Sequence, residues 1–221
     1  MTFIIHCPNY ENNNQLENVF PIKRRKYNNQ FFENVDILTW NNSNEESILE
    51  KSLHILGMKC EVLGKSIQNW SNRLKINLTY DFLEKSKKPY VLGVDAFDAI
   101  FIDYPRYMNH DMIFNATPGS FPFKKEFDLY EESITNSSIF CHFNAGVWFG
   151  KREMCLRFFK DALNYKDNFT EQYPDSEQVV LRSILPNHKY VKLDDKCRYF
   201  QIINDFKELD QYLQIQYKMF N

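Results

Sequence analysis

Two aspartates three positions apart, Asp95 and Asp98, point most directly to chemistry in this sequence. They follow the apolar run Tyr90-Val-Leu-Gly-Val94, which is typical of a buried parallel strand. Open α/β sheets bind ligands outside the carboxyl ends of their strands. Two carboxylates on a turn at such an end can converge on Mg²⁺ or Mn²⁺, which can bridge them to a diphosphate. The alternative is that both aspartates only cap a turn or a short helix.

Other polar groups are weaker candidates for a site. Asp175-Ser-Glu-Gln178 holds two carboxylates, although Asp175 is also a suitable N-cap for the helix predicted after it, with Gln178 at the capping-box position. Asp194-Asp195 follows a predicted strand. Asn144-Ala-Gly146 follows another, where small residues allow close backbone approach to a ligand, although Asn-x-Gly is more often a turn. Four aromatic residues in predicted loops could stack on a base or sugar, or pack at the rim: Trp40, Trp70, Phe97 and Phe121.

The composition limits how a ligand could be held. The chain has 27 Lys and Arg against 29 Asp and Glu, which excludes a generally basic nucleic-acid binder. Its six glycines form neither GxGxxG nor GxxxxGK[ST], so the common phosphate-binding loops are absent and a metal is the natural substitute. The basic stretch Lys23-Arg-Arg-Lys26 could contact phosphate or a membrane surface, but a solvated arm is the simpler interpretation.

The cysteines and the apolar runs indicate the class of protein. Five widely spaced cysteines without a CxxC motif fit neither a disulfide framework nor a zinc ribbon, so we expect them to be reduced. The sequence starts without the basic region of a signal peptide, and no run reaches the roughly 18 apolar residues of a membrane span. We therefore expect a soluble, cytoplasmic protein.

Hydrophobic periodicity predicts alternating strands and helices from residue 35 onward. Strands are expected at residues 35–40, 60–63, 90–94, 112–114, 139–143 and 190–193, and helices at residues 45–56, 71–85, 151–163, 176–185 and 206–217. The β-α-β-α-β order of the first half implies a right-handed doubly wound sheet. Residues 1–34 are predicted to be an irregular N-terminal arm, and residues 35–221 a single α/β domain.

Taken in order, these segments resemble the glycosyltransferase domain of the procollagen lysyl hydroxylase/glucosyltransferase family, from about residue 35 to residue 204. Val94-Asp-Ala-Phe-Asp98 resembles the family's Val-Asp-x-Tyr-Asp metal motif, and Leu193-Asp-Asp-Lys-Cys-Arg-Tyr-Phe-Gln201 resembles Leu-Asp-His-Lys-x-Arg-Ile-Phe-Gln. Weaker matches lie at Val62-Leu-Gly-Lys65 with Trp70, at the helix containing Lys75, at Phe143-Asn-Ala-Gly-Val-Trp-Phe-Gly150 and at Asp175-Ser-Glu-Gln178. Six motifs in the same order are more specific than any one of them.

The resemblance implies a GT-A fold, a Rossmann-like fold with a mixed central sheet, and retaining transfer of a hexose from a UDP-sugar. Asp95 and Asp98 would hold Mn²⁺ or Mg²⁺. In the family, glucose passes to galactosyl-hydroxylysine, so a collagen-like polypeptide is the expected acceptor. The resemblance further implies a set of catalytic residues and a set that binds the nucleotide, with Phe97 where the family stacks an aromatic ring on uracil. The catalytic set is Asp175, Glu177 and Asn144, and the nucleotide set is Trp40, Asn41, Trp70, Lys75 and Phe97.

The sequence also departs from the family. The family's third metal ligand is a histidine in a His-Gly-Asn-Gly segment, and none of the five histidines here lies in such a motif. Either the segment lies outside this sequence, or water or another side chain completes the coordination, or the activity is weak. Phe121 and Thr117 stand where the family has Trp and Glu, so its acceptor contacts are not carried over. The alternative functions are a degenerate GT-A domain that binds nucleotide or protein without turnover, and a transferase that uses UDP-galactose with another acceptor.

Overall fold

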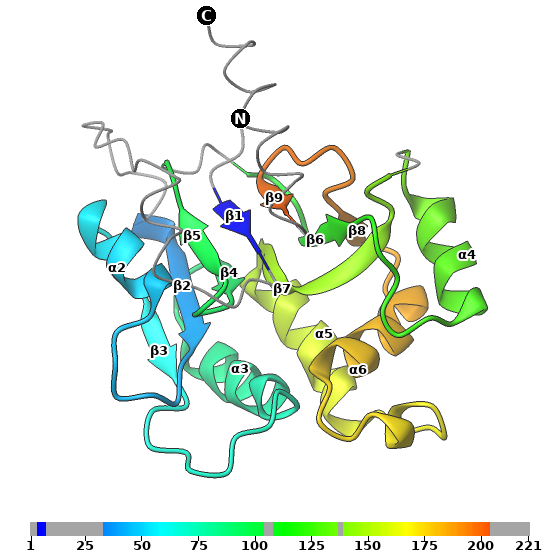
Figure 1. Cartoon of the computed structure of the whole chain (residues 1–221), viewed down its shortest axis with the longest axis horizontal. Helices are drawn as coiled ribbons and strands as arrows, with labels where there is room; N and C mark the ends of the chain where they lie inside the picture. Colours follow the sequence, from blue (N-terminus) through cyan, green and yellow to red (C-terminus); the bar gives the residue numbers. More distant parts are fainter. Residues whose placement is uncertain (1–3, 8–32, 104–107, 137–138, 204–221) are drawn as a thin grey trace, which may run out of the picture.

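A six-stranded mixed sheet forms the centre of the protein in the computed structural model, which describes residues 4–7, 33–103, 108–136 and 139–203 (Figure 1). The strand order is β3-β2-β4-β7-β6-β8, and neighbours run parallel except around β7, which is antiparallel to both of its neighbours. This confirms the predicted α/β class and mixed central sheet, in a Rossmann-like single domain. The strands are β2 (Val35–Trp40), β3 (Glu61–Leu63), β4 (Tyr90–Val94), β6 (Met112–Thr117), β7 (His142–Lys151) and β8 (Val191–Leu193).

A second, three-stranded sheet has β1 (Ile4–His6) at its centre, antiparallel to β5 (Ala99–Phe101) and parallel to β9 (Phe200–Ile202). The expectation of an irregular arm over residues 1–34 is therefore wrong at its start, where residues 4–7 are buried. A three-residue strand gives too short a pattern to predict, and both of its partners are distant in sequence. The basic stretch at residues 23–26 and the helix predicted at 206–217 lie outside the described residues.

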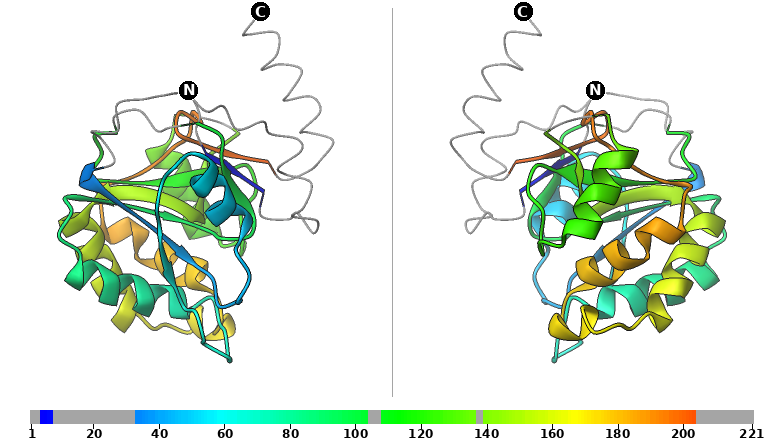
Figure 2. Two further views of the ribbon diagram at one scale, coloured as in Figure 1. Left: turned by 90° about the vertical axis from the view of Figure 1, so that its left-hand side faces the viewer. Right: turned by 90° about the vertical axis from the view of Figure 1, so that its right-hand side faces the viewer.

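Helices cover one face of the central sheet, and the small sheet with α2 covers the other (Figure 2). The covering helices of the first face are α3, α5 and α6. The helix bounds are α2 (Ile48–Ile55), α3 (Leu74–Lys85), α4 (Lys125–Ile134), α5 (Arg152–Asn164) and α6 (Glu177–Ile184), with 3₁₀ turns at Thr170–Gln172 and Leu185–Asn187. The sequence pattern does not predict α4, because this helix buries Asp128 and Glu131 beside Phe127 and so has no continuous apolar stripe.

Both faces of the central sheet are buried, which explains the apolar runs in its strands. Successive side chains of a strand point to opposite faces. On β2, Leu38 and Trp40 therefore pack with the helices, whereas Ile37 packs with the small sheet. On β4, Val91 and Leu92 separate in the same way. Burying one of these large apolar side chains contributes roughly 1.5–3 kcal/mol to the stability of the fold. The alternation of buried residues along each strand therefore fixes which residues can reach the site at the strand ends.

The contact between β4 and β7 depends on a glycine. Gly93 lies opposite Trp148, and a Cβ atom at Gly93 would overlap the Trp148 indole ring. Beyond the end of β4, the Asp95 amide donates to the Gly146 carbonyl at 2.8 Å. The close strand pair therefore delivers Asp95 to the middle of β7.

Some predicted boundaries are corrected by the structure. Asn144-Ala-Gly146 lies within β7 rather than after a strand, because the strand continues to Lys151. Ser176, not Asp175, caps α6 and accepts from the Val179 amide. Ser71, where the helix predicted at residues 71–85 starts, accepts from the Arg73 amide. It does not cap α3, because that helix begins at Leu74 with Arg73 at its N-cap position.

Two further expectations concern the cysteines and the membrane. The five cysteines, all among the described residues, form no disulfide bond, as predicted from their spacing. Among the residues that the structure describes, no helix combines the length and apolar character needed to cross a membrane.

Candidate metal centre

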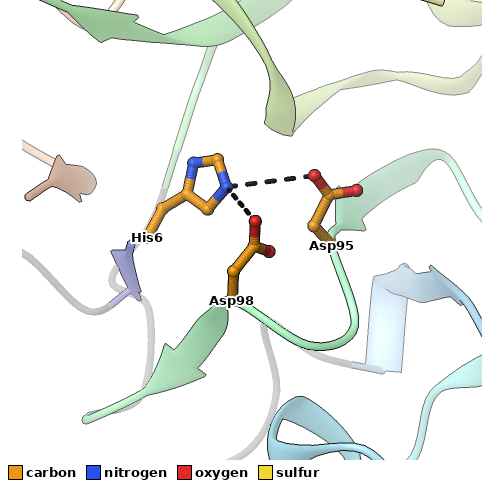
Figure 3. A group of neighbouring side chains, drawn as sticks. All are labelled: His6, Asp95 and Asp98. Carbon is orange, nitrogen blue, oxygen red and sulfur yellow. Dashed lines mark ion pairs between the residues drawn. The ribbon is translucent and has the colours of Figure 1, made fainter. Parts of the chain in front are cut away.

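Three side chains from separate parts of the chain converge at the carboxyl end of β4. His6 belongs to β1, Asp95 follows β4, and Asp98 precedes β5. Nε2 of His6 lies 3.4 Å from Oδ2 of Asp98 and 3.9 Å from Oδ2 of Asp95. Figure 3 shows the imidazole ring directing this nitrogen at both carboxylates. One ligand atom from each residue lies within 4.8 Å of the others, which is close enough to share one ion.

The environment of these atoms suits a cation. His6 is only 1% exposed, and its Nε2 has no hydrogen-bond partner among the described residues. Buried polar atoms are normally paired, so such an atom calls for an explanation. The carboxylates of Asp95 and Asp98 remain 18% and 26% exposed, which leaves the cluster open to solvent on one side. One imidazole and two carboxylates form a donor set that suits Mn²⁺, Fe²⁺ or Zn²⁺ better than Ca²⁺.

Gly146 forms the wall of this cluster. A Cβ atom at this position would come within 2.6 Å of His6 Nε2 and 2.7 Å of Asp95 Oδ2. The sequence pattern indicated close backbone approach at Asn144-Ala-Gly146, and the partners in that approach are the side chains of His6 and Asp95.

An irregularity in the β6–β7 ladder brings Gly146 to this place. The register shifts between Phe114 and Asn115, so Asn115 pairs with Asn144. The displaced amides of β7 are bound by side chains: Ala145 N donates to Gln178 Oε1 at 3.2 Å, and Gly146 N donates to Asn144 Oδ1 at 3.0 Å. Bulges of this kind re-aim side chains next to active sites. Asn144, which the family resemblance placed among the catalytic residues, stabilises this strand irregularity.

Lys75 links two of the predicted site residues. Its Nζ lies 2.6 Å from Asp95 Oδ1 and 3.0 Å from Glu177 Oε1. Lys75 comes from the first turn of α3, and Glu177 begins α6. With Asp98, three carboxylates face one ammonium group, so the cluster has a net charge of minus two when His6 is neutral. A divalent cation would balance that charge.

The crowded charges perturb the pKa values of the cluster. Burial raises the pKa of Asp95 to about 6, although Lys75 opposes this shift, and the neighbouring Asp98 raises it further. Burial acts in the same direction on Asp98, but His6 outweighs it and holds the pKa of Asp98 below its ordinary value. Burial disfavours the charged form of His6, yet the two aspartates raise its pKa. The positive charge near Asp95 and Asp98 is therefore too small to stabilise both carboxylates in their charged form.

Two residues expected at the nucleotide are committed to other contacts. Trp40 is buried in the core, where its Nε1 donates to Thr79 at 3.2 Å, so it is not a loop aromatic open for stacking. The Asn41 amide donates to Glu45 O and to Glu50 Oε2, and its Oδ1 accepts from Ser43 N. The side chain of Asn41 therefore holds the loop after β2 together. Lys75 Nζ lies 5.5 Å from the Trp40 ring centroid, so this indole supports the lysine.

Other predicted residues remain accessible. Phe97 is 39% exposed on the turn between Asp95 and Asp98. Trp70 is half-buried against Gly64, and its Nε1 donates to Asn72 Oδ1 at 3.2 Å. Asp175 has an exposed side chain, and its carbonyl accepts from Arg73 N at 3.0 Å.

The candidate pair Asp194-Asp195 does not form a metal site. Both carboxylate oxygens of Asp194 accept from backbone amides, namely those of Arg198, Tyr199 and Phe200. Asp195 instead accepts from Asn136 N at 2.6 Å. The two side chains are used to shape separate loops.

A second group of possible ligands, formed by Asp128, Glu131 and His142, contains its own cation. The buried Arg182 guanidinium contacts Asp128 Oδ1 at 2.5 Å and Glu131 Oε1 at 2.5 Å. It also donates to the Pro122 carbonyl at 2.7 Å. Arginine forks match carboxylates well, so this group is an ion-pair network that ties α4 to α6.

Neither a scan against protein-family models nor a search of curated proteins matches this chain. The site itself is therefore the basis for assigning a function. Sequence reasoning found Asp95 and Asp98 but missed His6, whose only signal was a histidine after the apolar run Phe3-Ile-Ile. That pattern is too short to distinguish a buried strand from an irregular arm.

Proposed function

We propose that this protein is a metal-dependent glycosyltransferase that transfers a hexose from a UDP-sugar. The observation that supports this proposal is the His6–Asp95–Asp98 donor set at the carboxyl end of β4. Ligand sites of open α/β sheets lie at such ends. The chain has no glycine-rich phosphate loop, so a diphosphate needs another partner. A cation held by these three side chains meets that need.

We assign the third ligand position to His6. The resemblance to the procollagen glucosyltransferase family leaves that position open, because the family's histidine motif does not occur in this sequence. His6 offers a buried nitrogen without a hydrogen-bond partner among the described residues, directed at both aspartates. A bound divalent cation would stabilise the negative charge that develops on a UDP leaving group.

The remaining side chains of the site would orient the donor. Lys75 keeps the Asp95 carboxylate turned toward the cluster through its 2.6 Å contact and adds positive charge near the diphosphate position. Glu177 shares the same ammonium group and is the nearest additional carboxylate for contacts to the sugar. Phe97, exposed between the two aspartates, is available to stack on the uracil base.

The donor and the acceptor follow from the family resemblance. UDP-glucose is the first choice and UDP-galactose the second, with a collagen-like galactosyl-hydroxylysine peptide as acceptor. The test is UDP release from each sugar nucleotide with Mn²⁺, with and without that peptide. Mn²⁺-dependent release that disappears in Asp98→Asn supports the proposal. Equal release by the variant contradicts the metal part of it.

A nucleotide-binding module without turnover is the second candidate. Two of the residues expected in catalysis already have partners within the protein, which favours this candidate. Glu177 is paired with Lys75, and Asn144 accepts from the β7 backbone. This candidate predicts that UDP with Mn²⁺ raises the melting temperature although no sugar nucleotide is consumed. An absence of any thermal shift with UDP and Mn²⁺ would contradict both candidates.

A further inference from the structure

The second nitrogen of the His6 ring also has a partner. Asn115 on β6 is fully buried, and its side-chain amide lies against the ring, with Nδ2 3.4 Å from His6 Nδ1. The amide oxygen of Asn115 has no hydrogen-bond partner among the described residues. An apolar residue of the same shape would avoid this unpaired oxygen, so the amide costs stability at this position.

The orientation of this amide decides which ring nitrogen can bind a cation. When Nδ2 donates to Nδ1, the ring proton of neutral His6 sits on Nε2, and Nε2 then has no free lone pair. Metal binding by Nε2 needs the opposite tautomer, with the proton on Nδ1. A half-turn of the Asn115 amide exchanges Nδ2 and Oδ1 and places an acceptor against that proton.

We propose that Asn115 is the positioning residue for His6, and that its Oδ1 accepts from Nδ1–H when Nε2 binds the cation. This inference rests on the metal site of the proposed function. Asparagine suits the position because its amide offers a donor to the metal-free ring and an acceptor to the metal-bound ring. A carboxylate would offer only the second contact, and a leucine neither.

The strand geometry supports this role. The register shift in the β6–β7 ladder falls at Asn115, and the same irregularity brings Gly146 against the Nε2 side of the ring. The regular β6–β7 pairing is therefore interrupted next to the His6 ring. Asn115 lies at Nδ1 of that ring, and Gly146 lies close to Nε2. Both contacts therefore lie at the same irregularity of the β6–β7 ladder.

The first test is Mn²⁺ affinity, measured by electron paramagnetic resonance without any sugar nucleotide. Asn115→Leu preserves volume but removes both contacts, so we expect about 10- to 100-fold weaker binding. Asn115→Asp retains an acceptor and should bind at least as tightly as the unaltered protein. His188→Gln is the matched control, because His188 is also buried with an Nε2 that lacks a hydrogen bond among the described residues. Unchanged affinity in Asn115→Leu, or equal losses in the Leu and Asp variants, would overturn the proposal.

The second test reads the tautomer directly in the unaltered protein. Histidine-selective ¹⁵N labelling gives five rings to assign, and His6→Gln identifies the His6 signals. With Zn²⁺ as a diamagnetic probe, we expect the proton on Nδ1 and the metal on Nε2. The reverse assignment would overturn the proposal even if the variants do not fold. Neither test uses a sugar nucleotide, so an absence of turnover would contradict the proposed function without affecting this result.

Discussion

His6 Nε2 lies 3.4 Å from Asp98 Oδ2, and the two residues meet because β1 pairs with β5. His6 is in register with Ala99, the residue directly after Asp98, and the Cys7 amide donates to the Asp98 carbonyl at 2.6 Å. The same strand pairing that adds the N-terminal segment to the fold therefore completes the proposed metal centre. The site is therefore complete only when β1 is paired with β5.

Replacing His6 should remove Mn²⁺ binding without preventing folding. His6→Gln keeps a polar side chain but loses the directed ring nitrogen, so we expect affinity to fall by more than about 100-fold, beyond the loss typical of an outer-shell partner. Isothermal titration calorimetry measures the affinity. The control His188→Gln removes a histidine of similar burial and should change the affinity less than about twofold, well below an outer-shell effect. Equal affinities of the two variants would contradict the role of His6.

Replacing Asp98 should change the titration of its neighbour as well as metal binding. Burial is the main cause that raises the pKa of Asp95 to about 6, and the Asp98 charge adds to it. Asp98→Asn removes that charge while keeping the shape, so the pKa of Asp95 in the metal-free protein should fall below about 6. Carboxyl ¹³C chemical shifts followed against pH provide the measurement. An unchanged or higher value would show that the two carboxylates do not interact.

Gly146 should not tolerate even one methyl group. The Cβ of Gly146→Ala would lie 2.6 Å from His6 Nε2 and 2.7 Å from Asp95 Oδ2. The ring must then shift, at a cost of about 1–3 kcal/mol in unfolding free energy and with loss of Mn²⁺ binding. Urea denaturation and metal titration report the two effects. Gly119→Ala is the matched control, since nothing lies within 4 Å of a Cβ there, and it should be neutral in both measurements.

Arg182 should be important for stability but not for metal binding. It is fully buried between Asp128 and Glu131, and Arg182→Met would leave two carboxylates without their cation. We expect a loss of about 3–5 kcal/mol in unfolding free energy, measured by urea denaturation. The exposed Arg157→Met should change stability by less than about 0.5 kcal/mol. Weaker Mn²⁺ binding in folded Arg182→Met would contradict the prediction that Arg182 is unimportant for the metal centre.

The capping box of α2 should give a pH-dependent contribution to stability. Ser47 Oγ accepts from Glu50 N, and Glu50 Oε2 accepts from Ser47 N at 2.9 Å. Burial would raise the pKa of Glu50, but the Ser47 and Asn41 hydrogen bonds outweigh it and hold the pKa below its ordinary value. The contribution of Glu50 to the unfolding free energy is therefore fully present above its unfolded-state pKa. It is lost as the pH falls through its folded-state pKa.

Ser47→Ala should lower the unfolding free energy by about 1 kcal/mol near neutral pH. Glu50→Gln should reduce the difference in stability between pH 7 and pH 4, whereas the exposed Glu45→Gln should preserve it. Thermal melts across that range measure both effects. An identical pH dependence in Glu50→Gln and the unaltered protein would contradict the assignment.

The sequence by itself determined the features that depend on local pattern. The strands at residues 35–40 and 90–94 were predicted with their observed bounds, because residues unsuited to a strand flank them: Asn34 and Asn41 for the first, Pro89 and Asp95 for the second. The positions of Asp95 and Asp98 followed from the second of these strands, since the turn after a buried strand must emerge at the sheet edge. Asparagine and glycine at 144 and 146 signalled a close approach, but not its partners.

The tertiary structure alone decided the rest. His6 belongs to a three-residue strand whose partners, β5 and β9, are distant in sequence, so no local pattern indicates it. The sequence pattern does not predict α4 because the face that this helix buries includes Asp128 and Glu131, whose charges are paired by Arg182 from α6. Trp40 and Asn41 stand at a strand end where the sequence allows either a ligand contact or a core contact. In the structure Trp40 packs in the core, and the buried Asn41 side chain is bonded within the loop after β2. Both outcomes depend on burial and hydrogen bonds that only the complete fold supplies.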